Sequence, residues 1–470
     1  MSDSKKRYTY LFSNIAAFLC GSLGSKLFSF FMVPLYTNVL LPAEYGEIDL
    51  ILSVAGVLSP FVACGIHEGI MRFSLDKGTD QQLVFSIGLR VFLISSALFL
   101  ALTPLIKQIP LISNNAYFLY WYCILNELMT ILLCYIRGKD NTKLYAFLGF
   151  LSVLFTASLN ILFMVGLRWG LFGYKTSMLI SPIMVSVAAI LLGNLFPDFS
   201  VMRWERKAAK EMLQYSIILI PNALLWWCIN ASDRFFVSYI CGASENGLYA
   251  VAYKIPTLLS TVASVFMQAW QMSAIREHEE RSGSDFSESV YKHLTFFMCV
   301  VTSSLMLINR DVLSVYVSSE YTGAWLYSPM LMLSFFAGAL STFWGSFYIA
   351  SKNMKTYLGS AVIGAAINIV LNFVLIHSIG TIGAAVATTV SYISVFVVRS
   401  AGICKAVQLK VVNHQLVTAA VCLAVGLFAA YLPRGFAWGI GLINLAVYLL
   451  LNRKLLVSTM ELALKLLRRN

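Results

Sequence analysis

Apolar runs long enough to cross a membrane recur from one end of this 470-residue chain to the other. An α-helix needs ~20 mostly apolar residues to span the hydrocarbon core of a bilayer. The runs are continuous and lack the alternation of apolar and polar residues that marks a membrane β-barrel. We therefore predict an all-α polytopic membrane protein with about fourteen transmembrane helices, near residues 8–37, 46–70, 82–106, 116–136, 143–166, 170–196, 210–240, 246–272, 288–308, 325–349, 356–377, 383–403, 414–431 and 436–452.

The composition leaves little room for a soluble domain. Charged residues make up 12% of the chain and hydrophobic residues 59%, whereas a soluble domain carries about twice that share of charge. The longest polar interval before the C-terminal tail, residues 276–289, is too short to fold alone. We therefore expect no enzyme activity, no catalytic residues and no cofactor.

The basic residues are distributed unevenly between the two sides of the predicted membrane topology. With a cytoplasmic N-terminus, the tails, the connections after even-numbered spans and the adjoining span ends hold 25 of the 34 Lys and Arg residues. The opposite connections hold 4, and 5 lie inside spans. Because positive charge accumulates on the cytoplasmic side, we expect both termini in the cytoplasm. The net charge of +12 therefore reflects topology, and we expect no nucleic-acid partner.

Short motifs recur about 200 residues apart and suggest two lobes of six helices. Because six is an even number, both lobes begin on the same side, and the repeat is parallel. We place an N-lobe in residues 1–200, a C-lobe in 201–408, and two extra transmembrane helices with a basic amphipathic cytoplasmic tail in 409–470. The tail either lies on the inner leaflet as a helix or is frayed. The paired motifs are Glu44-Tyr45-Gly46 with Glu245-Asn246-Gly247, and Leu159-Asn160, Gly170 and Gly173 with Leu371-Asn372, Gly380 and Gly383.

Seven ionisable residues lie within predicted spans, where burial of a charge costs ~3 kcal/mol or more. Such residues usually face a cavity or a partner. Five basic against two or three acidic side chains, the third being Asp49, suit an anion such as a pyrophosphate, held by Lys as a point charge or by Arg as a fork. The basic residues are Lys26, Arg90, Lys175, Arg234 and Lys254, and the acidic ones are Glu127 and Asp233.

Simpler explanations exist for several of these charges. Lys26 and Arg90 could extend to the membrane surface, and Asp233 could neutralise Arg234 or Lys254. Asp49 begins the second span, close enough to the interface to be hydrated.

Two tryptophans are the candidates for contact with sugar rings. Trp226 lies seven residues before Asp233, so the two share a face of a continuous helix, and Trp227 is its neighbour. Most Trp residues in membrane proteins form interfacial belts instead. The five histidines lack ligand spacing, so we assign no metal. The nine cysteines are scattered and are expected to pack as small apolar residues.

The stretch Ser232-Asp233-Arg234-Phe235, followed by Gly247-Leu248-Tyr249-Ala250-Val251-Ala252-Tyr253-Lys254, resembles the second-lobe signature of Wzx-type polysaccharide repeat-unit flippases. This family belongs to a superfamily with the MATE exporters and the lipid II flippase. Residues 42–46 carry a weaker echo in the first lobe, where Ser53 occupies the position equivalent to Lys254.

The resemblance implies two lobes forming a V around a central cavity that opens alternately to each side of the cytoplasmic membrane. The implied substrate is an undecaprenyl-pyrophosphate-linked oligosaccharide, moved from the inner to the outer leaflet. Implied partners are membrane lipids, a polysaccharide polymerase and a coupling H⁺ or Na⁺. From their positions, Asp233 and Glu127 are the residues that could carry the ion.

Two other functions predict different sequence features. A MATE-like exporter of organic cations predicts an acidic cavity, whereas the intramembrane charges are mostly basic. A membrane-embedded polymerase or ligase usually needs a large outer loop, whereas the longest outer connection here, residues 309–324, is short.

Overall fold

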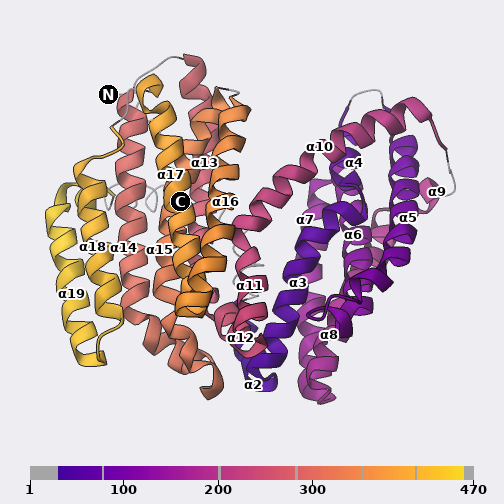
Figure 1. The fold of residues 1–470 in the computed structure, drawn as a ribbon. Coiled ribbons are helices and arrows are strands. Elements are labelled where there is room, and N and C mark those ends of the chain that lie inside the picture. The colour runs from indigo at the N-terminus through magenta and orange to yellow at the C-terminus, as the bar shows by residue number, and fades with distance from the viewer. Residues whose placement is uncertain are drawn as a thin grey trace. The chain divides into compact units, whose positions relative to one another are not determined.

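The computed structural model describes residues 30–76, 79–199, 203–280, 284–351, 353–407 and 410–459, and over these ranges it contains helices and no strand (Figure 1). The chain divides into two compact units. One runs from Pro34 to Gly247, and the other from Leu248 onwards together with the chain before Pro34.

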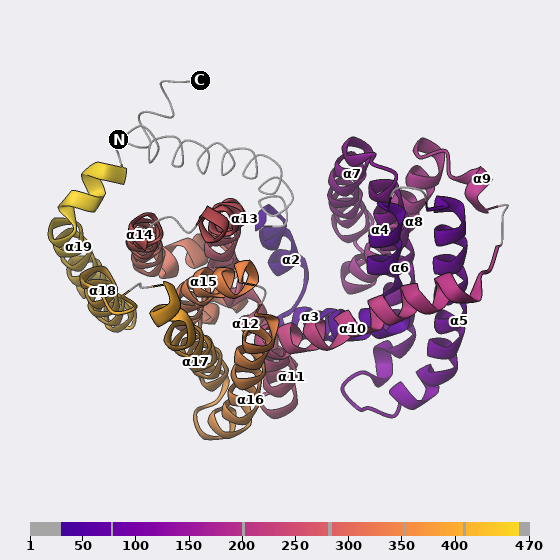
Figure 2. The same cartoon turned by 90° about the horizontal axis from the view of Figure 1, so that it is seen from above.

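The unit from Pro34 to Gly247 is organised around helix α6. Helix α6 packs against the two helices before it, the two after it, and α3 (Figure 2). The elements of this unit are α2 (Val33–Val39), α3 (Pro42–Val62), α4 (Ile66–Ser74), α5 (Gln81–Ile106), η1 (Ser113–Asn115), α6 (Ala116–Gly138), α7 (Thr142–Asn160), the π-helical segment η2 (Ile161–Gly166), α8 (Gly170–Leu192), α9 (Phe196–Phe199), α10 (Arg206–Asn230), α11 (Ser232–Ile240) and the first turn of α12 (Ala243–Ala252).

Its core is apolar and tightly packed. Phe85 of α5 stacks on Tyr135 of α6 with ring centroids 4.4 Å apart, and both side chains are buried. Gly88 of α5 admits Ile70 of α4, because a Cβ at Gly88 would lie 2.3 Å from the Ile70 Cδ1 atom. These contacts fix α4 and α5 around α6.

The unit after Gly247 is organised around helix α15. Helix α15 packs against α13, α14, α16, α17 and α18 (Figure 2), and 78% of its most apolar segment is buried. The elements are α13 (Lys254–Glu280), α14 (Ser284–Tyr316), the 3-10 segment η3 (Ser319–Leu326), α15 (Ser328–Ala350), α16 (Met354–Ile379), α17 (Thr381–Val407), α18 (His414–Ala430) and α19 (Arg434–Leu451).

The last two helices lie at the periphery of this unit. Helices α18 and α19 pack on each other and on α14, and only 6% of the most apolar segment of α19 is buried. An apolar helix with so little protein contact is suited to a lipid environment. The predicted tail helix beyond Thr459 lies outside the described residues.

Several helices begin where the sequence places an Asp or Asn. Asp80, Asn141, Asn353 and Asn413 each accept a hydrogen bond from the backbone N–H of the second or third residue after them, at the starts of α5, α7, α16 and α18. Such N-caps satisfy donors that the helix itself leaves unpaired. The sequence therefore sets these helix starts locally.

The structure confirms a multi-pass, all-helical membrane protein. Eleven described helices or helix pairs are long and apolar enough to span a bilayer, and α18 is a shorter apolar helix. Each predicted span after the first coincides with one or two described helices. The count of fourteen is not confirmed, because the first span, 8–37, lies mostly outside the described residues.

Three predicted spans are broken. Span 46–70 divides into α3 and α4, span 210–240 into α10 and α11, and span 246–272 into α12 and α13. Hydropathy is averaged over a window of residues, so it detects the length of an apolar run but not a helix break within it.

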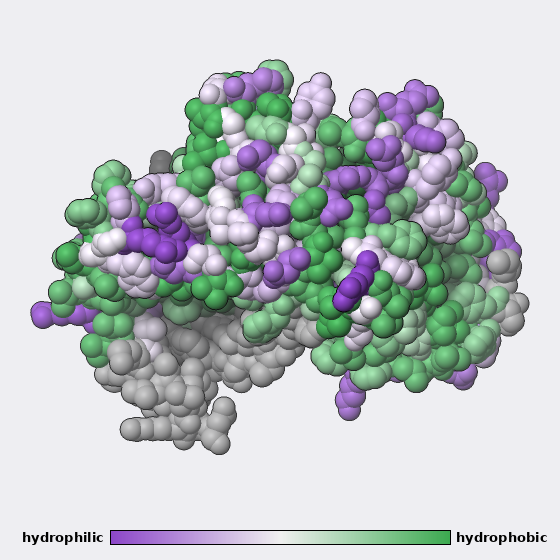
Figure 3. All heavy atoms as spheres, turned by 90° about the horizontal axis from the view of Figure 1, so that it is seen from below, coloured by the Kyte–Doolittle hydropathy of each residue, from purple (hydrophilic) through white to green (hydrophobic). Residues whose placement is uncertain are grey.

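The outward faces carry many large apolar side chains, including Phe31, Phe172 and Leu450. Such exposure would be a liability in water and is normal against lipid tails. In the view from below, hydrophilic side chains gather over the interior of the visible face, and hydrophobic ones form much of its edge (Figure 3).

The helix junction predicted as part of the repeat is built in the same way in both units. Gly170, the first residue of α8, has φ +51°, and Gly380, the residue before α17, has φ +69°, conformations that glycine adopts without steric cost. A Cβ at Gly173 would lie 2.9 Å from the Phe163 backbone, and one at Gly383 would lie 2.5 Å from the Leu375 backbone. This likeness supports the predicted repeat, while the lobe boundaries at 200 and 408 stay a prediction.

Candidate functional site

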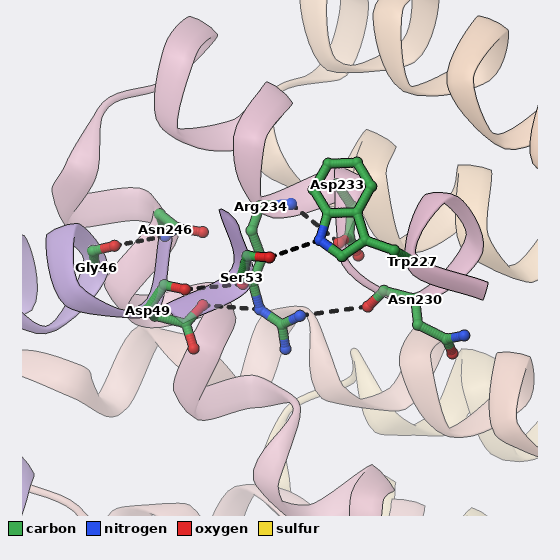
Figure 4. Close-up of polar contacts among 8 residues, drawn as sticks. All are labelled: Gly46, Asp49, Ser53, Trp227, Asn230, Asp233, Arg234 and Asn246. Carbon is green, nitrogen blue, oxygen red and sulfur yellow. Dashed lines mark hydrogen bonds and ion pairs between the residues drawn. The ribbon is translucent and has the colours of Figure 1, made fainter. Parts of the chain in front are cut away.

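Four of the sequence-predicted residues lie where α10 gives way to α11. The chain leaves helical geometry at Ala231, with φ −140° and ψ −14°. Ser232 and Asp233 then open α11, and the Asp233 Oδ1 atom accepts a hydrogen bond from the backbone N–H of Arg234 at 2.9 Å. An aspartate in the first turn also interacts favourably with the helix dipole. The break turns Arg234 toward α3 (Figure 4).

Arg234 forms an ion pair with Asp49. The Arg234 Nε and Asp49 Oδ2 atoms lie 2.7 Å apart, and the side chains are 17% and 15% exposed. Arg234 also donates from its NH1 group to the Asn230 carbonyl at 3.3 Å. The sequence placed Asp49 at a hydrated interface, but Asp49 lies two turns inside α3 and is mostly buried. The carboxylate beside the Arg234 guanidinium is therefore contributed by another helix.

A second contact fastens α10 to α3 one turn further along. The Trp227 indole Nε1–H donates to the Ser53 carbonyl at 2.6 Å, and the Ser53 hydroxyl donates to the Asp49 carbonyl at 2.8 Å (Figure 4). Trp227 therefore serves as a packing and hydrogen-bonding contact in this structure. The Trp226 side chain lies outside the described residues, and the predicted shared face of Trp226 and Asp233 loses its basis because the helix breaks at Ala231.

The two glycine-containing motifs of the repeat lie against each other. Asn246 in the first turn of α12 donates to the Gly46 carbonyl at 2.7 Å (Figure 4). A Cβ at Gly46 would lie 1.9 Å from the Ala243 carbonyl oxygen, and one at Gly247 would lie 2.0 Å from the Pro42 carbonyl oxygen. Only glycine allows backbones to approach so closely. The start of α12 is thus held on the start of α3, beside the Asp49–Arg234 pair.

Lys175 is bound within a polar chain. Its Nζ donates to the Asn115 Oδ1 atom at 2.6 Å, and the Asn115 amide donates to Glu47. The ammonium also lies 6.0 Å from the Phe118 ring centroid. This arrangement links α8, η1 and α3, so Lys175 is held by protein groups here.

Glu127 lies inside the unit and is paired with His67. The Glu127 side chain is 4% exposed, and its Oε1 atom lies 2.6 Å from the His67 Nδ1 atom. His67 could not be selected from the sequence, because its partner lies 60 residues away on another helix. The one local sign was a histidine next to Glu68 inside a predicted span.

Two further predicted residues lie on other helices, α5 and α13. Arg90 lies within α5 and is half-buried, and Lys254 begins α13 in the other unit. Lys26 lies outside the described residues. Among the residues that the structure describes, no group of three or more His, Cys, Asp and Glu could hold a metal ion.

A further cation is buried in the unit after Gly247. Arg399 of α17 is 2% exposed and donates to the Ser360 hydroxyl at 2.9 Å and to the Ser341 carbonyl at 3.1 Å. Its guanidinium lies 4.3 Å from the Tyr357 ring centroid. No acidic side chain contacts it in the described part of the chain. Arg399 is one of the 25 basic residues assigned to the cytoplasmic side and its span ends, whereas the structure encloses it in protein.

The fold is shared with transporters of known structure. The lipid II flippase MurJ in an inward closed conformation matches 94% of this chain and 100% of its own, with a TM-score of 0.69 and 16% sequence identity. A multidrug resistance MATE family transporter of the MOP superfamily, in its inward-facing conformation, matches 82% of this chain and 95% of its own, with a TM-score of 0.66 and 15% identity.

The sequence comparisons agree with the fold. An uncharacterized membrane protein of Methanocaldococcus jannaschii, MJ1375, is 23% identical over 431 residues, covering 84% of this chain and 93% of that protein. The profile of the polysaccharide biosynthesis protein family matches residues 11–271, more than half of the chain. These matches agree with the predicted resemblance, and the two solved structures share its fold. The chain therefore belongs to the polysaccharide biosynthesis protein family.

Proposed function

We propose that this protein flips a polyprenyl-diphosphate-linked oligosaccharide from the inner to the outer leaflet of the cytoplasmic membrane, coupled to H⁺ or Na⁺. The family match supports a role in polysaccharide biosynthesis, and the fold shared with a lipid II flippase supports movement of a lipid-linked sugar. The lipid tail would remain in the bilayer while the diphosphate and sugars pass through a polar path.

The Asp49–Arg234 pair is the observation that carries this proposal. A guanidinium is always charged and binds carboxylates and phosphates with the same fork geometry. In the structure, a carboxylate from α3 lies beside this guanidinium at a helix break. A diphosphate would displace the Asp49 carboxylate from the Arg234 guanidinium. When Asp49 pairs with Arg234 again, its negative charge would repel the diphosphate and favour its release. Arg90, Lys175 and Lys254 remain proposed contributors to the same anion path.

Asp233 is a second proposed participant. Its carboxylate caps the Arg234 backbone, so loss or gain of charge at Asp233 would act on the same short helix. Asp233 and Glu127 remain the proposed carriers of the coupling ion.

The test is leaflet-specific detection of the lipid-linked oligosaccharide in cells that lack the gene and carry a variant. Replacement Arg234→Ala should abolish delivery to the outer leaflet, and Arg234→Lys should retain part of it because a point charge still attracts phosphate. Arg203→Ala is the matched control, since Arg203 is an exposed arginine paired with Asp80. We expect normal delivery in that control.

Three outcomes would count against the proposal. Normal delivery in a membrane-inserted Arg234→Ala variant would remove the role of Arg234. Normal delivery in the deletion strain would remove the flippase function. A deletion strain that delivers the oligosaccharide normally but becomes sensitive to organic cations would indicate a MATE-like exporter instead.

A further inference from the structure

We propose that His67 and Glu127 form a proton-binding site that couples proton movement to transport. This inference rests on the proposed function, because it supplies the ion and the residues for an ion-coupled flippase. It adds His67, a residue that the sequence analysis set aside.

The pair joins two helices of one unit, α4 and α6, which pack side by side (Figure 1). The His67 Nδ1 and Glu127 Oε1 atoms lie 2.6 Å apart. A proton between them can belong to the imidazole, facing a carboxylate, or to the carboxylic acid, facing an imidazole nitrogen. The Glu127 carboxylate is 4% exposed in a membrane-spanning unit, and a charge buried there costs free energy. Protonation of Glu127 removes that cost.

The second imidazole nitrogen faces a route to solvent. The His67 Nε2 atom lies 3.8 Å from the Glu68 Oε1 atom. Side-chain exposure falls along this series from 51% at Glu68 to 21% at His67 and 4% at Glu127. An exposed carboxylate, a partly exposed imidazole and a buried carboxylate therefore lie in sequence.

The transfer balances without any further reactant. A proton from solvent or Glu68 binds the His67 Nε2 atom, and the proton on Nδ1 passes to the Glu127 carboxylate. The imidazole ends neutral with its proton on Nε2, and Glu127 ends as a neutral acid. One proton has entered the site, and the reverse sequence releases it.

Few other charged or titratable side chains lie near this pair. Helix α6 also presents Cys123 and Cys134 near Glu127, with Arg137 one turn beyond Cys134. From helix α10, the Ser216 hydroxyl lies next to Gly69, and the Tyr215 ring packs against Phe73 near Arg72. Helix α5 packs against α4 through an apolar contact between Gly88 and Ile70. Apart from Glu68, no further charged side chain contacts His67 or Glu127 in the described ranges.

The site lies at a break in the chain. Helix α3 contains Pro60 and ends at Val62, Cys64 and Gly65 adopt φ values of +52° and +62°, and α4 begins at Ile66. His67 is thus in the first turn of α4, where the helix dipole favours a nearby anion. Neutralising Glu127 would weaken that attraction and shift the balance between two arrangements of α4. Discontinuous helices beside ion sites are a recurring arrangement in transporters.

The first test needs no substrate. Infrared spectroscopy of the full-length protein in lipid nanodiscs, recorded as a function of pH, should show the protonation of Glu127 as a carboxylic acid signal. We expect the Glu127→Gln variant to lose that signal, Glu127→Asp to retain it, and His67→Gln to move its midpoint by at least one pH unit. His293→Gln, in α14 of the other unit, is the control and should leave it unchanged. Identical titrations in the wild-type and Glu127→Gln proteins would overturn the proposal.

The second test separates this inference from the proposed function. Leaflet delivery of the cell's own lipid-linked oligosaccharide is measured in inverted membrane vesicles with and without an imposed pH gradient. The wild-type rate should rise with the gradient, whereas the His67→Gln and Glu127→Gln variants should show less than a twofold difference between the two conditions. A gradient response equal to wild type in both variants would overturn the proton site. Absence of delivery in wild-type vesicles would contradict the flippase function and leave the infrared result to decide the site.

Discussion

The Asp49–Arg234 pair explains how two charges can lie inside a membrane protein. Each neutralises the other, and both side chains keep about one-sixth of their surface accessible. Removing one partner of a buried pair leaves the other charge uncompensated and typically costs about 3–5 kcal/mol, whereas removing both together can be neutral. Residual exposure should bring the cost here toward or below the lower end of that range.

We predict that Arg234→Gln lowers the unfolding temperature of the purified protein and that adding Asp49→Asn restores it. The physical reason is that the double variant leaves no buried charge without a partner. Thermal unfolding followed by tryptophan fluorescence measures this effect, and leaflet delivery is recorded in the same variants.

The two readouts separate a structural pair from a functional one. We expect the double variant to be stable but inactive, because the guanidinium that would hold the diphosphate is gone. If delivery recovers together with stability, Arg234 serves only to neutralise Asp49, and the anion-binding proposal fails.

Arg399 shows a different way of burying a cation. A hydroxyl, a carbonyl and an aromatic face surround it, with no carboxylate among its described contacts. A planar guanidinium can stack on Tyr357 while donating at its edge, which an ammonium cannot do. The chain therefore uses both ion pairing and stacking to hold arginines away from water.

At the scale of helices, close backbone contact sets how α3 and α12 begin. Gly46 and Gly247 leave no room for a Cβ, because the nearest atoms are backbone carbonyl oxygens that cannot rotate away. This contact fixes the start of α3, and Asp49 follows one turn later on the same helix. The geometry of the ion pair therefore depends on two glycines that carry no chemistry.

We predict that Gly247→Ala and Gly46→Ala each reduce the amount of folded protein in the membrane, because an added methyl group at either position would overlap a carbonyl oxygen. Gly149→Ala in α7 is the matched control, since nothing lies within 4 Å of a Cβ there. That change should be neutral or stabilising by about 0.5–1 kcal/mol through helix propensity. The yield and unfolding temperature of each variant check the prediction, which fails if the three alanine variants behave alike.

Breaks within helices place the other candidate groups. Ala231 separates α10 from α11 and sets the direction of Arg234, and the break before α4 places His67 against Glu127. Both breaks fall inside runs that hydropathy treats as one span. Short helices bearing charged side chains at their first turns are thus a shared feature of the two candidate sites.

At the scale of the whole molecule, membrane orientation follows from the distribution of basic residues. We predict that cysteines introduced at Ser113, Ser318 and Gly435 react with an impermeant thiol reagent in intact cells, and that cysteines at Asn141, Lys207 and Lys352 do not. The 25-to-4 distribution of Lys and Arg between the two sides is the physical reason. The unmodified protein, with its nine cysteines, gives the background. Labelling at Lys207 from outside would reverse the proposed topology.

The sequence by itself determined the class of fold and most helix positions. Apolar runs of membrane-spanning length predicted the helices from α5 to α8 and from α14 to α19 to within a few residues, except that α14 continues past its predicted end to Tyr316. N-cap residues such as Asp80 and Asn141 account for several starts. These features are local or additive along the chain, so they can be recognised without knowledge of the contacts between helices.

The tertiary structure alone decided which charges meet. Asp49 and Arg234, and likewise His67 and Glu127, lie on different helices, and their distances depend on how those helices break and pack. Spacing along one helix cannot report a contact between two, and a break at Ala231 cancels the spacing argument that linked Trp226 to Asp233. The sequence could list the costly intramembrane charges, but assigning partners required three-dimensional packing, because electrostatic pairing depends on distance in space and not along the chain.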